Sequence, residues 1–185
     1  SLTLEISARA KALAKEGHDI CSLSAGEPDF PTPPFIFEAA IKALQDGVTK
    51  YGPASGDPLL REAIANKFST LNQIPTQASQ ILVTNGGKQA IYNLLQIILN
   101  KDDEVLIPAP FWLSYPEMVK LAGAKPIIFN TSASNGFGLN IEALEKLVTN
   151  KTRLIIINSP GNPTGKVIKK SELENLANFL RINKD

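Results

Sequence analysis

Cysteine and histidine are nearly absent from this sequence of 185 residues, which contains one of each, Cys21 and His18. A single cysteine cannot form a disulfide within the chain, and such sparse use of cysteine is typical of a reducing compartment. A single histidine without clustered cysteines supplies neither the usual ligands of zinc nor a catalytic triad. The sequence therefore excludes a disulfide-stabilised domain and gives no support to zinc or Ser-His-Asp chemistry.

A dominant charge and long apolar runs are also missing. The chain has 19 Lys and Arg against 18 Asp and Glu, a formal net charge of +1, so it lacks the basic surface that nucleic acids or acidic membranes attract. No run approaches the roughly 18 apolar residues of a membrane span, and residues 1–16 do not resemble a signal peptide. We therefore expect a cytoplasmic protein that binds small molecules, without nucleic-acid or membrane partners.

Hydrophobic residues make up 43% of the chain, and their spacing predicts an α/β fold. The first part is helical, with a helix over 2–15 that Gly17 ends, an amphipathic segment over 37–48 and a helix that begins at Asp57 and Pro58. Short strands and helices then alternate, which predicts a mostly parallel sheet covered by helices on both faces. The expected strands are 81–83, 105–107, 126–129 and 154–157. The expected helices are 86–99, 115–121, one capped by Asn140 that contains Leu144, Leu147 and Val148, and one with a capping box of Ser171 and Glu174.

The turn after the first of these strands is a candidate phosphate site, because ligands of open α/β sheets gather at the carboxyl ends of strands. Gly86, Gly87 and Lys88 follow this strand and begin a helix. The glycines allow close backbone approach, and the N–H groups of a helix N-terminus attract phosphate. The residues also fit a simple tight turn, and they match neither the dinucleotide fingerprint nor the nucleotide phosphate loop. The motif alone therefore leaves both interpretations open.

Two further turns add an aromatic ring and an amide at the same edge of the predicted sheet. Trp112, the only tryptophan, follows the second strand in a turn stiffened by prolines. Residues 158–165 (NSPGNPTG) follow the fourth strand, and this polar turn is too long and too specific for simple chain reversal. The three turns together predict a ligand site with a phosphate seat, an aromatic plane and an amide.

Five motifs carry a resemblance to a known family, and they cover nearly the whole chain in the family's order. They are residues 24–30 (SAGEPDF), 50–53 (KYGP), 86–90 (GGKQA), 110–118 (PFWLSYPEM) and 158–165 (NSPGNPTG). With these motifs the sequence resembles the class I aminotransferases of pyridoxal-phosphate fold type I, and it looks closest to their bacterial aspartate aminotransferase branch. The resemblance implies pyridoxal 5'-phosphate as cofactor, with an amino acid and a 2-oxo acid as substrates.

The resemblance also implies which residues bind the cofactor. The backbone of Gly86, Gly87 and Lys88 seats the cofactor phosphate, which agrees with the argument from the helix N-terminus. The ring of Trp112 stacks on the pyridine ring, and the amide of Asn162 donates to the phenolic oxygen of the cofactor. Both side chains also reach the substrate carboxylate. Tyrosine at position 51 is implied to contact the cofactor phosphate of a neighbouring subunit, so a homodimer is expected.

Substrate choice is assigned by the same resemblance to Lys88. In this branch the lysine pairs with the side-chain carboxylate of the substrate, Thr3 lines the same pocket, and the backbone of Gly26 contacts the α-carboxylate. A cation beside a ligand carboxylate is a direct cause of specificity for acidic substrates. One departure is Gly161, where many relatives carry asparagine, and we expect it to loosen the turn.

The expected domain organisation is a part of the family architecture. Residues 1–25 match an N-terminal arm and small-domain segment, and residues 26–185 match the N-terminal part of the large cofactor-binding domain. The lysine that forms the imine with the cofactor lies beyond the point that matches Asp185, so no catalytic residue is assigned and the chain alone is expected to be inactive. The family's sheet has the strand order third, second, fourth, fifth, sixth, seventh, first, so the strand at 81–83 would lack its neighbours.

Two alternatives to an aspartate aminotransferase stay open. An aspartate/prephenate aminotransferase fits because the pair of Thr3 and Lys88 also marks relatives that accept prephenate. The ligand-sensing domain of a transcription regulator has the same fold but follows a DNA-binding domain. The helix over 2–15 matches the enzymes' own N-terminal segment, which disfavours the regulator. The gene sequence on both sides of this chain would separate the two classes.

Overall fold

The computed structural model describes residues 2–23 and 26–183, with side chains from residue 5 onward. The chain divides into two compact units, residues 1–52 and 53–185, and we describe each by itself.

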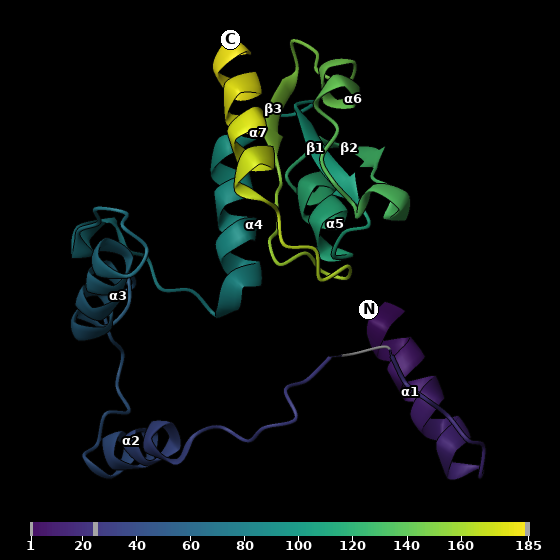
Figure 1. The fold of residues 1–185 in the computed structure, drawn as a ribbon. Coiled ribbons are helices and arrows are strands. Elements are labelled where there is room, and N and C mark those ends of the chain that lie inside the picture. The colour runs from purple at the N-terminus through teal and green to yellow at the C-terminus, as the bar shows by residue number, and fades with distance from the viewer. Residues whose placement is uncertain (1, 24–25, 184–185) are drawn as a thin grey trace. The chain divides into compact units, whose positions relative to one another are not determined.

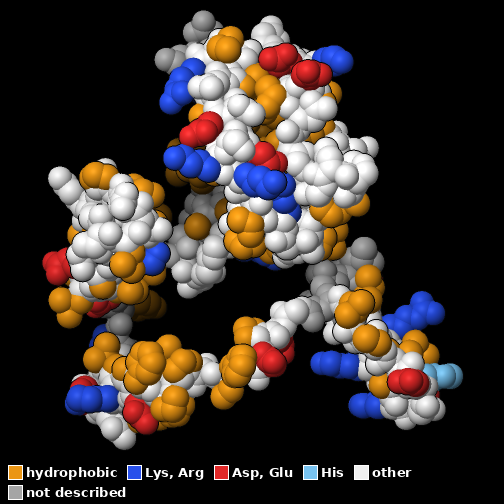
Figure 2. Space-filling model, viewed as in Figure 1, with side chains coloured by type: hydrophobic (Ala, Val, Ile, Leu, Met, Phe, Trp, Pro, Cys, Tyr) orange, Lys and Arg blue, Asp and Glu red, His pale blue; other side chains and the backbone are white. Residues whose placement is uncertain are grey.

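The first unit contains two helices. Helix α1 (Leu2–Lys15) ends where expected, because Gly17 adopts a φ of +91° that favours glycine and stops the helix. Helix α2 (Pro34–Gln45) begins with proline in its first turn. Every residue of α2 is at least partly exposed, and Figure 2 shows apolar side chains gathered on this helix. The expected amphipathic segment over 37–48 is therefore helical up to Gln45, and residues 46–48 lie beyond the helix.

The second unit begins with helix α3 (Pro58–Thr70) and the short 3-10 helix η1 (Ala78–Gln80). The carboxylate of Asp57 caps α3 by accepting from the N–H of Leu60 at 3.0 Å, as the sequence predicted. Arg61 joins the two helices, because its guanidinium donates to the carbonyls of Ile81 (2.9 Å) and Ala78 (2.7 Å). These bonds hold the extended segment after η1 against α3.

A three-stranded parallel sheet lies at the centre of the remaining residues. Strand β1 (Glu104–Ala109) lies between β2 (Lys125–Asn130) and β3 (Thr152–Ile155), in the order β2-β1-β3. Both pairings are parallel. This is the order that the family resemblance implied for the second, third and fourth expected strands, so the α/β fold is confirmed.

Helices cover both faces of this sheet (Figure 1). Helices α4 (Gly86–Ile98) and α5 (Ser114–Leu121) pack on the face to which Val105 and Ile107 point. Helices α6 (Ile141–Glu145) and α7 (Lys170–Ile182) pack on the face of Leu106. The alternation of side chains along β1 thus divides the core into two apolar clusters, one on each face.

The first expected strand is wrong. Residues 81–83 are extended, but they form no strand, and Leu82 is 59% exposed. The N–H of Val83 donates to the carbonyl of Ser55 at 3.0 Å, while the carbonyl of Ile81 accepts from Arg61. A strand needs a neighbouring strand, and among the described residues no strand pairs with this segment. This agrees with the family's strand order, in which the strand at 81–83 does not lie beside the next three strands.

Three smaller expectations are corrected at the ends of elements. The fourth strand spans Thr152–Ile155 instead of 154–157. Asn140 caps α6 as expected, but the helix ends at Glu145, before Leu147 and Val148. The capping box of Ser171 and Glu174 is wrong, because the N-cap is Lys169, two residues earlier, and Glu172 accepts from the N–H of Lys169 at 2.9 Å. None of the helices within the described residues is long and apolar enough to cross a membrane.

We predict that Leu144→Ala destabilises the protein that carries this chain by about 2–5 kcal/mol, because a fully buried leucine leaves a cavity when it is shortened. Leu121, which is 70% exposed on α5, provides a matched control, and Leu121→Ala should change stability little. Denaturant unfolding of both variants measures the difference. Equal unfolding midpoints for the two would contradict the assignment of Leu144 to the core.

Candidate functional site

The N-terminus of α4 is open to solvent at the carboxyl-end edge of the sheet. Gly86, Gly87 and Lys88 are its first residues, and all three are exposed. Gly86 has a φ of +80°, which favours glycine, and a Cβ added to Gly86 or Gly87 would meet nothing within 4 Å. The side chain of Asn85 caps none of the described N–H groups of this helix. The N–H of Gly86 donates to the carbonyl of Thr84 at 2.8 Å, so the helix presents the N–H groups that follow it, and the positive end of its dipole, to a bound anion.

The turn after β1 brings Trp112 to this helix. The ring of Trp112 packs edge-on against Tyr115, with centroids 5.3 Å apart and planes at 86°. The Nζ of Lys88 lies 4.8 Å from the centroid of the Trp112 ring, within the range of a cation-π contact. Tyr115 is buried, and this burial raises the pKa of its hydroxyl. A cation, an indole and a phenol thus lie in one row.

The turn after β3 is held by a series of hydrogen bonds. The N–H of Asn162 donates to the side-chain oxygen of Asn158 at 2.9 Å, and the N–H of Ile168 donates to the hydroxyl of Ser159 at 3.0 Å. Within the turn, the N–H of Gly165 donates to the carbonyl of Gly161 at 2.7 Å. The side chain of Asn162 is exposed. The turn therefore fixes the backbone of Asn162 while its amide stays accessible.

Gly161 takes part in closing this turn, and its expected loosening relative to asparagine stays a prediction. Its N–H donates to the carbonyl of Lys166 at 2.8 Å, and its carbonyl accepts from Gly165. A Cβ at this position would lie 2.8 Å from the hydroxyl of Thr164, which itself accepts from the N–H of Lys166 at 3.2 Å. Glycine therefore permits a close approach that a side chain would disturb.

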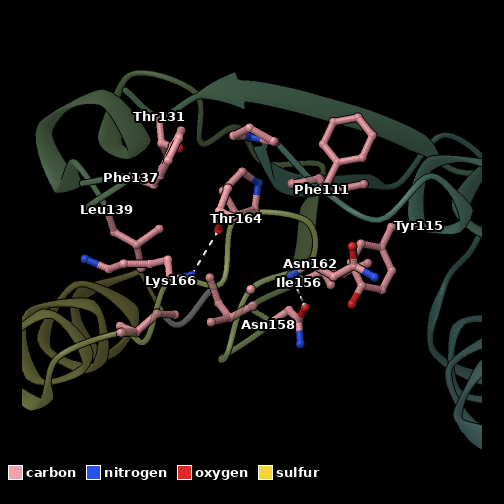
Figure 3. A pocket seen from close by; sticks show the side chains of 16 residues that line it. Phe111, Tyr115, Thr131, Phe137, Leu139, Ile156, Asn158, Asn162, Thr164 and Lys166 are labelled. Atoms are coloured by element: carbon pink, nitrogen blue, oxygen red, sulfur yellow. Dashed lines mark hydrogen bonds between the residues drawn. The ribbon is translucent and has the colours of Figure 1, made fainter. Parts of the chain in front are cut away.

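A cavity of about 50 Å³ lies between the turns after β1 and β3 (Figure 3). Phe111 and Tyr115 come from the turn after β1 and the start of α5, and Asn162 and Thr164 from the turn after β3. Parallel strands that are neighbours in a sheet end at the same edge, which is why these turns meet. The cavity wall is largely apolar, with the Asn162 amide among its polar groups.

The structure brings some of the predicted site residues together and leaves others apart. Lys88 and Trp112 are in contact, and Gly86 and Gly87 directly precede Lys88 in the first turn of α4. Asn162 lines the cavity that Tyr115, the ring partner of Trp112, also lines.

The remaining predicted site residues belong to the first unit. Gly26 and Tyr51 are both exposed there. The side chain of Thr3 and residues 24 and 25 of the first motif lie outside the described residues. The roles of these residues stay predictions.

Sequence reasoning missed Lys166 and Glu172. Their side chains form an ion pair of 3.1 Å beneath the turn after β3, and they are only 17% and 18% exposed. A glutamate at the third position of a helix is a recognisable capping signal. The signal was assigned instead to Ser171 and Glu174, because serine is the preferred cap and lysine at position 169 is not.

Comparison with known proteins places the chain in a family. Residues 18–184 match the model of "Aminotransferase class I and II". The chain belongs to this family of aminotransferases. The matched residues include the three strands of the sheet. They also include the start of α4 and the contacts among Lys88, Trp112 and Tyr115.

The relatives it matches include aspartate aminotransferases. The chain is 47% identical to the aspartate aminotransferase of Bacillus sp. strain YM-2, with 99% of this chain and 47% of the relative covered. It is 52% identical to the probable aspartate/prephenate aminotransferase of Rickettsia bellii, covering 98% and 45%. The structure of the aspartate aminotransferase from Thermus thermophilus with maleate has a TM-score of 0.93, with 44% identity and coverage of 98% and 48%. The chain therefore spans about half the length of these relatives.

We predict a pH-dependent contribution of Glu172 to stability. The hydrogen bond from the N–H of Lys169, followed by the side chain of Lys166 and the N–H of Leu139, lowers the pKa of this carboxyl against the opposing effect of burial. A carboxyl whose pKa is lower in the folded state stabilises the fold above its unfolded pKa, near 4.3, and loses this contribution as the pH falls toward the folded value.

Thermal unfolding of the native protein and of Glu172→Gln between pH 7 and about pH 3 measures this contribution. The native protein should unfold at the higher temperature from pH 7 down to about pH 4.3, and the gap should narrow below that pH as the carboxylate takes up a proton. A gap that stays constant below about pH 4.3 would show that the charge of Glu172 does not matter.

Proposed function

We propose that this chain is the N-terminal part of an aminotransferase that moves an amino group between aspartate or glutamate and a 2-oxo acid, with pyridoxal 5'-phosphate as cofactor. The observation that carries the proposal is the position of Lys88, whose cation lies over Trp112 at the open N-terminus of α4. The family match and the aspartate aminotransferases among the relatives support it. Pyridoxal phosphate supplies an electron sink that stabilises charge developing at the α-carbon of an amino acid.

The described residues fit three parts of this cofactor. The glycines and N–H groups at the start of α4 fit the phosphate, because they combine free space with a positive dipole end. The indole of Trp112 fits the aromatic ring, and the exposed amide of Asn162 fits the phenolic oxygen. Tyr115 packs edge-on against Trp112 and so limits the orientation of the indole. These residues bind and orient the cofactor.

Lys88 is the proposed determinant of acidic specificity. A lysine in the first turn of a helix opposes the helix dipole, so its position is unfavourable unless another interaction compensates. The cation-π contact with Trp112 supplies part of this compensation, and a substrate carboxylate would supply more. Maleate in the relative from Thermus thermophilus is a dicarboxylate like aspartate, which supports this assignment.

Prephenate is a second candidate substrate. Two relatives from Rickettsia carry the name probable aspartate/prephenate aminotransferase and are 51% and 52% identical to this chain, against 47% and 48% for the two aspartate aminotransferases from Bacillus. Prephenate also has two carboxylates, so the same cation serves both substrates. Transamination assays with aspartate, glutamate and prephenate on the whole enzyme separate the two candidates.

Further proposals follow from the resemblance. The functional unit is a homodimer in the cytoplasm, in which Tyr51 and the cofactor of the neighbouring subunit interact. Residues 1–25 form an N-terminal arm or small-domain segment, and residues 26–185 belong to the large domain. Thr3 and the backbone of Gly26 complete the substrate pocket. Analytical ultracentrifugation and the activity of Tyr51→Phe test the dimer and the role of the tyrosine.

We predict that the 185-residue chain produced alone has no transaminase activity and does not trap pyridoxal phosphate stoichiometrically on borohydride reduction. No lysine in the chain matches the family's imine-forming lysine, and nucleophilic chemistry needs that amine beside the cofactor. Mass spectrometry of the reduced chain gives the measurement, with the whole enzyme as positive control. One cofactor bound covalently to each chain would overturn the assignment of the catalytic lysine to a position outside these residues.

We predict that Lys88→Ala in the whole enzyme lowers kcat/KM for aspartate and glutamate by about 10-fold to 100-fold, the size expected when a charge-assisted hydrogen bond is lost. An uncharged amino acid has no distal carboxylate to lose, so its kcat/KM should change little. Steady-state kinetics with both substrate types give the measurement.

Lys120→Ala serves as a control for this experiment, because Lys120 pairs with Glu117 on the exposed surface of α5. An equal loss for acidic and neutral substrates in Lys88→Ala would mean that Lys88 supports the cofactor or the fold instead. The assignment to acidic substrates would then lose its physical basis.

A further inference from the structure

The ion pair between Lys166 and Glu172 differs from the other ion pairs that the structure describes. Both of its side chains are less than a fifth exposed, at 17% and 18%, whereas each side chain in the other pairs is at least about half exposed. Exposed pairs contribute little, because water and salt screen them. A largely buried pair with further hydrogen bonds holds its two side chains in place more firmly, because breaking the pair leaves a poorly solvated charge.

Glu172 joins the turn after β3 and the start of α7, which are near it in the chain, to the loop before α6, which is distant. Its carboxylate accepts from the N–H of Lys169 at the start of α7 (2.9 Å) and from the N–H of Leu139 in the loop before α6 (3.3 Å). The Nζ of Lys166 lies 3.1 Å and 3.2 Å from its two oxygens. The carboxylate is therefore a common acceptor beneath the turn after β3.

Lys166 extends this anchor into the turn that carries Asn162. Its carbonyl accepts from the N–H of Gly161 at 2.8 Å, and its own N–H donates to the hydroxyl of Thr164 at 3.2 Å. Gly161 and Thr164 flank the short segment that contains Asn162. The backbone of Lys166 thus closes the turn, while its side chain ties the turn to α7. Figure 3 shows the hydrogen bond between Lys166 and Thr164 and the one between Asn162 and Asn158.

We propose that Lys166 and Glu172 are positioning residues for Asn162: the largely buried pair fixes the turn after β3 so that the exposed amide keeps its place at the cofactor. This proposal rests on the proposed function, which places the Asn162 amide at the phenolic oxygen of pyridoxal phosphate. The lowered pKa of Glu172 keeps the pair charged near neutral pH. Neither residue touches the cofactor, so both act through the turn.

The expected consequence is a change in the titration of the bound cofactor. An amide that donates to the phenolic oxygen withdraws negative charge from it, and that charge would otherwise stabilise the proton on the nearby imine nitrogen. A displaced amide donates less well, so the pH midpoint at which the absorbance of the bound cofactor changes should rise. A contribution to folding stability alone would leave this midpoint unchanged.

The test uses the whole enzyme with its cofactor and three single variants. Glu172→Gln removes the charge, Lys166→Met breaks the ion pair but leaves the carboxylate to cap α7, and Glu174→Gln is the matched control. Glu174 lies on the same helix in an exposed pair with Lys170 at 3.8 Å. Both variants of the anchor should raise the absorbance midpoint by about 0.3 to 1 pH unit, the size of a weakened hydrogen bond. The control should leave the midpoint in place.

The same substitutions made in a variant that already carries Asn162→Ala show whether the ion pair acts through Asn162. If the anchor acts through Asn162, Glu172→Gln should add no further shift once the amide is removed, because residues that act in series are not additive. Hydrogen exchange in residues 158–168 should rise in Glu172→Gln and Lys166→Met but not in the control. Additive shifts, or a midpoint that Lys166→Met leaves unchanged, would overturn the positioning role.

The outcomes separate this proposal from the proposed function. If Asn162→Ala moves the midpoint and neither anchor variant does, the anchor proposal fails while the cofactor site stands. If the native enzyme binds no pyridoxal phosphate, or Asn162→Ala leaves the midpoint in place, the assignment of Asn162 to the cofactor fails first. If Glu172→Gln does not fold, Lys166→Met still decides, because the carboxylate keeps its bonds to Lys169 and Leu139.

Discussion

Parallel pairing on both sides of β1 is the constraint on which the rest of this structure depends. Strands that run in the same direction end at the same edge, so the turns after β1 and β3 meet there. Alternate side chains of β1 point to opposite faces, and each face is covered by helices. The position of Trp112 and of Asn162 follows from this arrangement, because each residue lies in a turn that directly follows one of these strands.

The chemistry at this edge combines groups that would be weak individually. An open helix N-terminus attracts anions, but its contribution is modest in water. An exposed lysine in the first turn would normally be solvated, and here its cation lies over an indole that is itself held edge-on by Tyr115. Because each group limits the freedom of the next, less conformational entropy is lost when a ligand binds.

Much of the fold could be predicted because its signals are local. The apolar runs at β1 and β2, the Asp57 and Asn140 caps and the glycine that ends α1 each depend on residues within one or two turns. The expectation for residues 81–83 failed for the same reason. The local pattern there is that of a strand, but a strand exists only with a partner, and the segment bonds to α3 instead. At α7, serine at position 171 gave a stronger capping signal than lysine at 169, although the glutamate that caps is Glu172.

The sequence by itself determined the α/β class, the order of elements from α4 to α7, the family resemblance and the three turns that carry Gly86, Trp112 and Asn162, because these depend on spacing and residue type. Only the tertiary structure decided that Lys88 lies over Trp112, that Tyr115 fixes the indole, and that Glu172 joins the turn after β3 to the loop at Leu139. Tyr115 follows Trp112 by only three residues and meets it where the turn enters α5. The contacts of Lys88 with Trp112 and of Glu172 with Leu139 connect segments that are far apart in the chain, so no local pattern contains them. They form because packing on the two faces of β1 brings the segments together.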